Sequence, residues 1–150
     1  MLEITFNSIY FFITLVLFKI DLKYYKLPFS LTLSLIFLGL LKAYFFNNLK
    51  IHLIAFILAA FIFIIIYVIS FLIYKKEALG LGDCLLACGI GSFWGINHIF
   101  YTIYYSFIFG GFYAVYLLIF TSKLKHHIIP FGPFLILSSW ANHLYFQIWF

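Results

Sequence analysis

The chain has 150 residues, of which 67% are hydrophobic and only 9% carry a charge. A soluble domain of this size has too little interior to hide that much apolar surface, so the composition excludes a soluble fold and predicts an integral membrane protein. The net charge of +5 comes from nine lysines that are spread over several turns, which excludes a concentrated nucleic-acid-binding patch.

Six apolar segments follow one another along the chain and are separated by short polar, glycine- or proline-containing turns. The predicted segments are approximately 4–20, 28–46, 51–74, 82–94, 98–120 and 131–150. We take Pro28 as the first helical residue of the second segment, because proline lacks the N–H donor that is unsatisfied at a helix start in any case. The sequence therefore predicts one all-α domain over residues 1–150, a polytopic membrane protein with about six transmembrane helices.

Lysine is distributed unequally between the two sets of alternating turns. One set holds Lys19, Lys23, Lys26, Lys75, Lys76, Lys123 and Lys125, and the other holds Lys42 and Lys50. By the positive-inside rule the first set faces the cytoplasm, and both chain ends lie on the far side of the membrane. This arrangement places Asp21, at the end of the first segment, and Asp83, at the start of the fourth, in the same leaflet.

Asp21 and Asp83 are the only aspartates in the chain. Acids at membrane depth are costly and mostly functional. If packing brings the two carboxyl groups together, one keeps its proton while the other ionises, and such a pair activates water against a carbonyl group. Gly80 and Gly82 leave room for a peptide backbone beside Asp83. The alternative interpretations are a helix cap for Asp83 and a solvated ion pair for Asp21.

Helix dipoles predict how the pair shares its proton. Asp83 is expected near a helix N-terminus, where the dipole favours the anion, and Asp21 near a helix C-terminus, where it does not. Asp21 is therefore the predicted proton-bearing member, and Asp83 the predicted base.

Three motifs resemble those of the type IV prepilin peptidases. Gly80-Leu81-Gly82-Asp83 is similar to the G-x-G-D motif of that family. The segment from Asp21 to Pro28 is similar to its first aspartate motif, in which Ile-Pro follows a basic stretch. Residues 129–135, with the sequence Ile-Pro-Phe-Gly-Pro-Phe-Leu, are similar to its late P-F-G-P-F-L motif.

The resemblance implies an intramembrane aspartic endopeptidase with Asp21 and Asp83 as its catalytic pair. Its substrates would be prepilin or pseudopilin precursors of type IV pili or type II secretion, whose basic leader peptides are cut at the cytoplasmic face of a bacterial or archaeal inner membrane. The residues implied to bind substrate or shape the site are Gly80, Gly82, Pro130, Phe131, Gly132 and Pro133. The partners are the precursor and the lipid bilayer, with no nucleic acid, metal or cofactor, and the oligomeric state is left open.

The chain departs from the family pattern at two positions, where substrate positioning is in question. Leu85 stands where the family commonly has lysine, and Phe29 stands where it commonly has asparagine. Bifunctional members also carry an N-terminal segment with paired C-x-x-C motifs linked to N-methylation, and Cys84 with Cys88 does not supply four zinc ligands. We therefore expect peptidase activity and leave N-methyltransferase activity open.

The remaining polar residues have simpler interpretations. Cys84 and Cys88 are expected to act as small buried hydrophobic residues, and Glu77 as a helix cap. The histidines are expected at segment ends, facing the membrane interface or a surface turn: His52, His98, His126, His127 and His143. The alternatives to a peptidase are a non-catalytic membrane protein that binds pilin-like helices and a small proton-coupled transporter.

Overall fold

The computed structural model describes residues 1–75, 80–120 and 130–149, and this part of the chain is helical throughout, without a strand. The helices are α1 (Leu2–Tyr24), α2 (Phe29–Phe45), α3 (Leu49–Tyr74), α4 (Leu81–Trp94), α5 (Ile96–Phe120) and α6 (Gly132–Trp149). The predicted all-α class and the six apolar segments are thus confirmed. Lys76, Glu77, Lys123, Lys125, His126 and His127 lie outside the described residues, as do the predictions made for them.

The prediction for Pro28 was wrong by one residue. Pro28 is the N-cap of α2, with an extended backbone (φ −69°, ψ 125°), and the helix begins at Phe29. The carbonyl of Pro28 accepts the first intrahelical hydrogen bond from the N–H of Thr32, at 3.2 Å. This is the geometry of a cap residue, whose carbonyl belongs to the helix while its dihedral angles do not.

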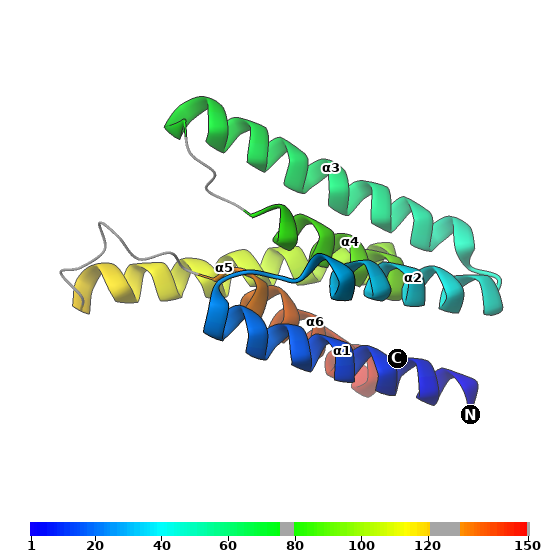
Figure 1. Cartoon of the computed structure of the whole chain (residues 1–150). Helices are drawn as coiled ribbons and strands as arrows, with labels where there is room; N and C mark the ends of the chain where they lie inside the picture. The colour runs from blue at the N-terminus through cyan, green and yellow to red at the C-terminus, as the bar shows by residue number, and fades with distance from the viewer. Residues whose placement is uncertain (76–79, 121–129, 150) are drawn as a thin grey trace.

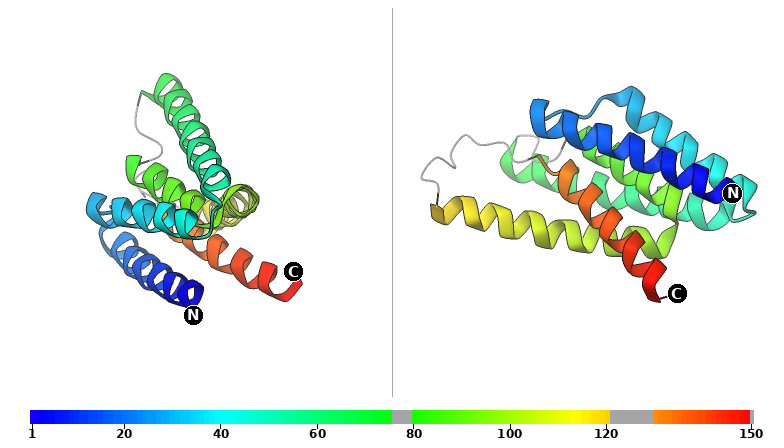
Figure 2. Two further views of the ribbon diagram at one scale, coloured as in Figure 1. Left: turned by 90° about the vertical axis from the view of Figure 1, so that its right-hand side faces the viewer. Right: turned by 90° about the horizontal axis from the view of Figure 1, so that it is seen from below.

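The short helix α4 forms the centre of the bundle. It packs mainly against α2 and α3 and also contacts α5 and α6, an enclosure that Figure 2 shows from two further directions. Every residue from Leu86 to Phe93 is buried. Glycines allow this close packing: a Cβ on Gly39 of α2 would lie 2.6 Å from the backbone N of Phe93, and one on Gly91 would lie 2.9 Å from the carbonyl O of Ala55 in α3. Contacts of this kind bring membrane helices together backbone to backbone.

Successive helices run in alternate directions between the two ends of the bundle (Figure 1). Both chain termini lie at one end. The C-terminal end of α1 and the start of α4 lie at the other end, and α3 diverges from the remaining helices as it approaches this end. The order of the segments therefore places Asp21 and Asp83 at the same end, as the sequence predicts.

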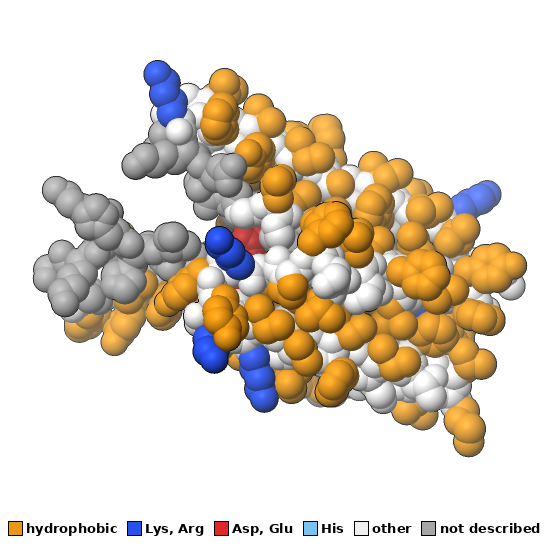
Figure 3. Space-filling model, viewed as in Figure 1, with side chains coloured by type: hydrophobic (Ala, Val, Ile, Leu, Met, Phe, Trp, Pro, Cys, Tyr) orange, Lys and Arg blue, Asp and Glu red, His pale blue; other side chains and the backbone are white. Residues whose placement is uncertain are grey.

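The surface and the helix lengths are those of a membrane protein. α1, residues Leu49–Ile73 of α3, and α5 are long and apolar enough to cross a membrane, whereas α2 and α4 are apolar but shorter. Apolar side chains cover the flanks of the bundle, and lysines project near its ends (Figure 3). Lys42 is an exception, because it is buried within α2 rather than in a turn, and its amine donates a hydrogen bond to Oδ1 of Asn7 at 3.0 Å.

Candidate active site

Asp21 lies in the last turn of α1 and is only 4% exposed. It shares the inner face of the helix with Tyr10, Thr14 and Leu17, all buried, because residues three or four apart lie on one side of a helix. The carbonyl O of Asp21 accepts the N–H of Tyr25 at 2.9 Å, and Tyr25 ends the helix in the left-handed conformation (φ 54°). The helical period therefore turns the carboxyl group into the bundle, and its interpretation as a solvated residue was wrong.

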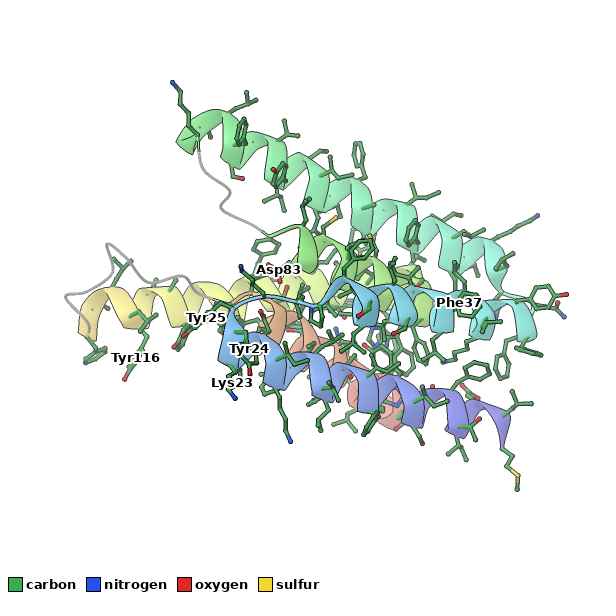
Figure 4. The ribbon with its side chains drawn as sticks, in the orientation of Figure 1. Lys23, Tyr24, Tyr25, Phe37, Asp83 and Tyr116 are labelled. Atoms are coloured by element: carbon green, nitrogen blue, oxygen red, sulfur yellow. The ribbon has the colours of Figure 1, made fainter. Side chains whose placement is uncertain are left out.

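Asp83 lies in the first turn of α4, where it is half-buried. The N-cap of this helix is Gly80, whose carbonyl O accepts the N–H of Asp83 at 3.1 Å, so Asp83 is not itself the cap residue. Figure 4 shows Asp83 at the end of the bundle that also holds Lys23, Tyr24 and Tyr25.

The two aspartates line the same cavity, which has a volume of about 260 Å³. Its other lining residues are Tyr25, Lys26, Leu27, Gly80, Leu81 and Gly82. The two carboxyl groups lie within electrostatic reach of each other. A larger cavity of about 680 Å³ lies between α5 and α6 and contains neither aspartate, so the chemistry of the lining and not its size identifies the candidate site.

Gly132, the first residue of α6, is pressed against Asp21. A Cβ built on Gly132 would lie 2.5 Å from Oδ2 of Asp21 and 3.3 Å from Cδ1 of Leu27. The backbone amide of Gly132 faces both carboxyl groups, yet the buried Oδ2 of Asp21 has no hydrogen-bond partner among the described residues. The N-terminal ends of α4 and α6 therefore both adjoin the pair, and the positive ends of two helix dipoles favour one negative charge there.

None of the described residues of the late motif, 130–135, is among those that line the cavity, although Gly132 contacts Asp21. Pro130 and Phe131 are half-buried, and Pro133 is buried. The ring of Phe131 packs against Phe63 of α3 and Phe107 of α5, with ring centroids 6.2 and 5.0 Å apart. This segment thus ties the start of α6 to two neighbouring helices.

The two departures from the family pattern also lie outside the cavity lining. Leu85 is half-buried on α4, and Phe29 is exposed at the start of α2. Cys84 and Cys88 are free thiols that pack with the hydrophobic core, as expected for small apolar side chains.

A buried polar cluster at the opposite end of the bundle was missed. His98 and His143 are 6% and 9% exposed and pack against Trp94, with ring centroids 5.0 and 4.3 Å apart. The Nδ1 atom of His52 is hydrogen-bonded to the carbonyl O of Ser92 at 2.8 Å. The expectation that His98 and His143 face the membrane interface was therefore wrong, whereas His52 is half-buried.

The sequence did hold one indication of this cluster, namely pairs of polar residues spaced four apart within single helices. His98 and Thr102 are four residues apart on α5, and Ser139 and His143 are four apart on α6, so each pair shares a helix face. The hydroxyl O of Thr102 in turn accepts a hydrogen bond from Nδ2 of Asn142 at 3.1 Å.

Comparisons with known proteins show to which family the chain belongs. A model of the type IV leader peptidase family matches residues 8–115, a segment that includes both aspartates and ends before the late motif. A prepilin leader peptidase/N-methyltransferase from Dichelobacter nodosus is 30% identical over 146 residues, which are 96% of this chain and 50% of that protein, so the chain spans about half the length of this relative. No solved structure shows a significant match. The chain belongs to the type IV leader peptidase family.

Proposed function

We propose that this chain is an aspartic endopeptidase that removes the leader peptide from type IV prepilin-like precursors. The observation that carries the proposal is that Asp21 of α1 and Asp83 of α4, far apart in sequence, line one small cavity at the same end of the bundle. Membership of the leader peptidase family supports the peptidase activity and the class of precursor.

The pair works by sharing one proton and one negative charge. The ionised carboxylate takes a proton from a water molecule, and the protonated carboxyl group donates a hydrogen bond to the carbonyl O of the scissile peptide bond. The water oxygen then attacks the carbonyl carbon and forms a tetrahedral intermediate. The C–N bond breaks as the carboxyl group that took the proton from water gives it to the leaving amine. The N-terminal ends of α4 and α6 stabilise the single anion before and after this step.

The walls of the cavity suggest how a peptide reaches the pair. Gly80 is exposed and Gly82 is half-buried, so one wall is bare backbone that an extended peptide can approach. Tyr25, Lys26 and Leu27, from the connection between α1 and α2, form the wall that carries side chains. The scissile bond would lie between these two walls.

The lysines support a cytoplasmic orientation for the site. Lys23, Lys26 and Lys75 are exposed, and Lys26 also lines the cavity. In Figure 3 an acidic side chain is visible beside a lysine at this end of the bundle. A lysine-rich end faces the cytoplasm under the positive-inside rule, so we place the enzyme in an inner membrane with its site open to cytoplasmic leaders.

Co-expression with a tagged prepilin-like precursor tests the proposal. Wild-type protein should shorten the precursor by its leader, as seen by gel mobility and mass spectrometry. Asp21→Asn and Asp83→Asn should each abolish cleavage with unchanged membrane expression, because an amide does not perform the proton transfer. Glu3→Gln, which removes an exposed carboxyl group at the opposite end, is the matched control. Substantial turnover by either aspartate variant would refute the two-carboxylate mechanism.

The packing of α1 supports a proton-coupled transporter less than it supports a peptidase. Polar side chains on the inner face of this helix include Tyr10 and Thr14, but Leu17, which is fully buried, lies between Thr14 and Asp21. A proton relay across the membrane needs a continuous polar chain. Cleavage by purified protein in detergent, without an ion gradient, distinguishes the two functions.

A further inference from the structure

Leu27 occupies the short connection between α1 and α2 and lines the cavity together with both aspartates. The side chain is half-buried and packs against the hydrophobic core. It carries no polar group, so it has no part in proton transfer, and its place in the cavity wall calls for another explanation.

The side chain of Leu27 fits between the starts of two helices. A Cβ on Gly82 of α4 would lie 2.9 Å from Cβ of Leu27, and a Cβ on Gly132 of α6 would lie 3.3 Å from its Cδ1. Gly82 directly precedes Asp83, and Gly132 abuts Oδ2 of Asp21. Leu27 therefore touches the backbone elements that adjoin each carboxyl group, and both contacts fill space that glycine leaves free.

The backbone around Leu27 is held on both sides. Tyr25 is fixed in the left-handed region by its hydrogen bond to the carbonyl O of Asp21. Pro28 fixes its own φ at −69° and restricts the residue before it to extended conformations. The connection thus has little freedom to move Leu27 away from the two glycines.

We propose that Leu27 is a positioning residue that sets the separation of the two aspartates by wedging between Gly82 and Gly132. This inference rests on the proposed peptidase function for its consequence in catalysis, and its physical content is the spacing of the carboxyl groups. When Leu27 is shortened, the starts of α4 and α6 can move closer together, and the two carboxyl groups with them.

Carboxyl titration tests the wedge without any substrate. Because the chain has only two aspartates, protein made by cell-free synthesis with carbon-13-labelled aspartate reports the pair alone in infrared spectra. Wild-type protein should protonate in two separate steps, since the first charge opposes the second. In Leu27→Ala the interval between the two steps should widen by about one pH unit or more, because carboxyl groups that come closer interact more strongly. Lys26, the other charged group that lines the cavity, is unchanged in every variant.

Catalysis should follow the titration. The acid limb of the pH profile of kcat marks protonation of the base, and the alkaline limb marks loss of the proton from the acid. The two limbs should therefore move further apart in Leu27→Ala. The value of kcat should fall on the order of tenfold to a hundredfold, as expected when reacting groups are misplaced by about an ångström. Leu27→Ile, which keeps the bulk of the side chain, should match the wild type in both the pH limbs and kcat.

Leu35→Ala is the matched control, because Leu35 of α2 also packs on a glycine of α4. A Cβ on Gly89 would lie 2.8 Å from Cδ2 of Leu35, and Leu35 does not line the aspartate cavity. Its titration should match that of the wild type. If either alanine variant fails to fold, Leu27→Val and Leu35→Val make the same comparison with a smaller deletion.

Three results would overturn the inference. These are unchanged titration steps in the Leu27 variants, the same change in the Leu35 variants, and a rise in KM with unaltered pH limbs, which would make Leu27 a substrate contact. If the wild type fails to cleave any precursor but the Leu27 variants still widen the interval between the titration steps, the proposed function fails and the wedge stands.

Discussion

At the scale of single residues, Asp21 and Asp83 lie at opposite kinds of helix end, and the start of a third helix, α6, adjoins both. Asp83 is in the first turn of α4 and Asp21 in the last turn of α1, so the positions assumed for the proton assignment are confirmed. The backbone amide of Gly132, at the start of α6, faces both carboxyl groups and so reduces the asymmetry. That Asp21 carries the proton stays a prediction, and isotope-edited infrared spectra of the separate Asn variants test it.

Gly132→Ala should damage the site directly. The new methyl group would lie 2.5 Å from Oδ2 of Asp21, a distance that forces either the carboxyl group or the start of α6 to move. Cleavage should fall on the order of tenfold to a hundredfold with little loss of expression. Gly111→Ala on α5 is the control, because its Cβ would meet nothing within 4 Å. Equal activities of the two variants in the precursor assay would show that Gly132 does not constrain Asp21.

At the scale of the helices, the sequence predicts where each element starts but not which side it buries. Glycine, proline, asparagine and lysine mark the turns, and every helix begins within two residues of the predicted position. With 67% hydrophobic residues, however, the inner and outer faces of a helix differ little in polarity, so the usual amphipathic signal is weak. The burial of Lys42 and His98 was missed for this reason, since their positions near helix ends suggested the membrane surface.

The contact between α2 and α4 should be the least tolerant of added volume. A Cβ on Gly39 would lie 2.5 Å from Oγ of Ser92 and 2.6 Å from the backbone N of Phe93, and a helix backbone does not give way as a flexible side chain does. Gly39→Ala should therefore destabilise the protein by about 1–3 kcal/mol. Thermal unfolding in detergent, with Gly111→Ala as the reference, measures the difference. A melting temperature equal to that of the reference would mean that the two helices pack less closely than described.

At the scale of the whole molecule, the location of Asp21 and Asp83 at the same end was predictable from order alone. Alternating helices return the chain to the end that holds both the C-terminal end of α1 and the start of α4 (Figure 1). Their approach to one cavity depends on packing, which the order of the segments does not record. The wedge formed by Leu27 was not predictable, because it depends on the distance between α4 and α6, which no pattern in the sequence records. Motif similarity predicted a role for Gly82 and Gly132 in shaping the site, and the packing shows what each of them contacts.

Reporter fusions test the orientation of the whole bundle. A reporter inserted after Lys26 should behave as cytoplasmic, and one inserted after Asn48 as external, because these positions lie at opposite ends of α2. An insertion after Lys125 should agree with Lys26. If the Lys26 and Asn48 fusions report the same compartment, α2 does not cross the membrane and the proposed topology is wrong.

The shortness of α4 bears on how water reaches the reaction. Its 14 residues span about 21 Å, whereas the 26 residues of α3 span about 39 Å and the hydrocarbon layer is about 30 Å thick. A central helix that is shorter than the bilayer is thick would, in the proposed topology, start below the level of the lipid headgroups and carry Asp83 there. The cavity of about 260 Å³ beside it has room for several water molecules. Under the proposed function, water would reach the scissile bond through this cavity and would need no path through lipid.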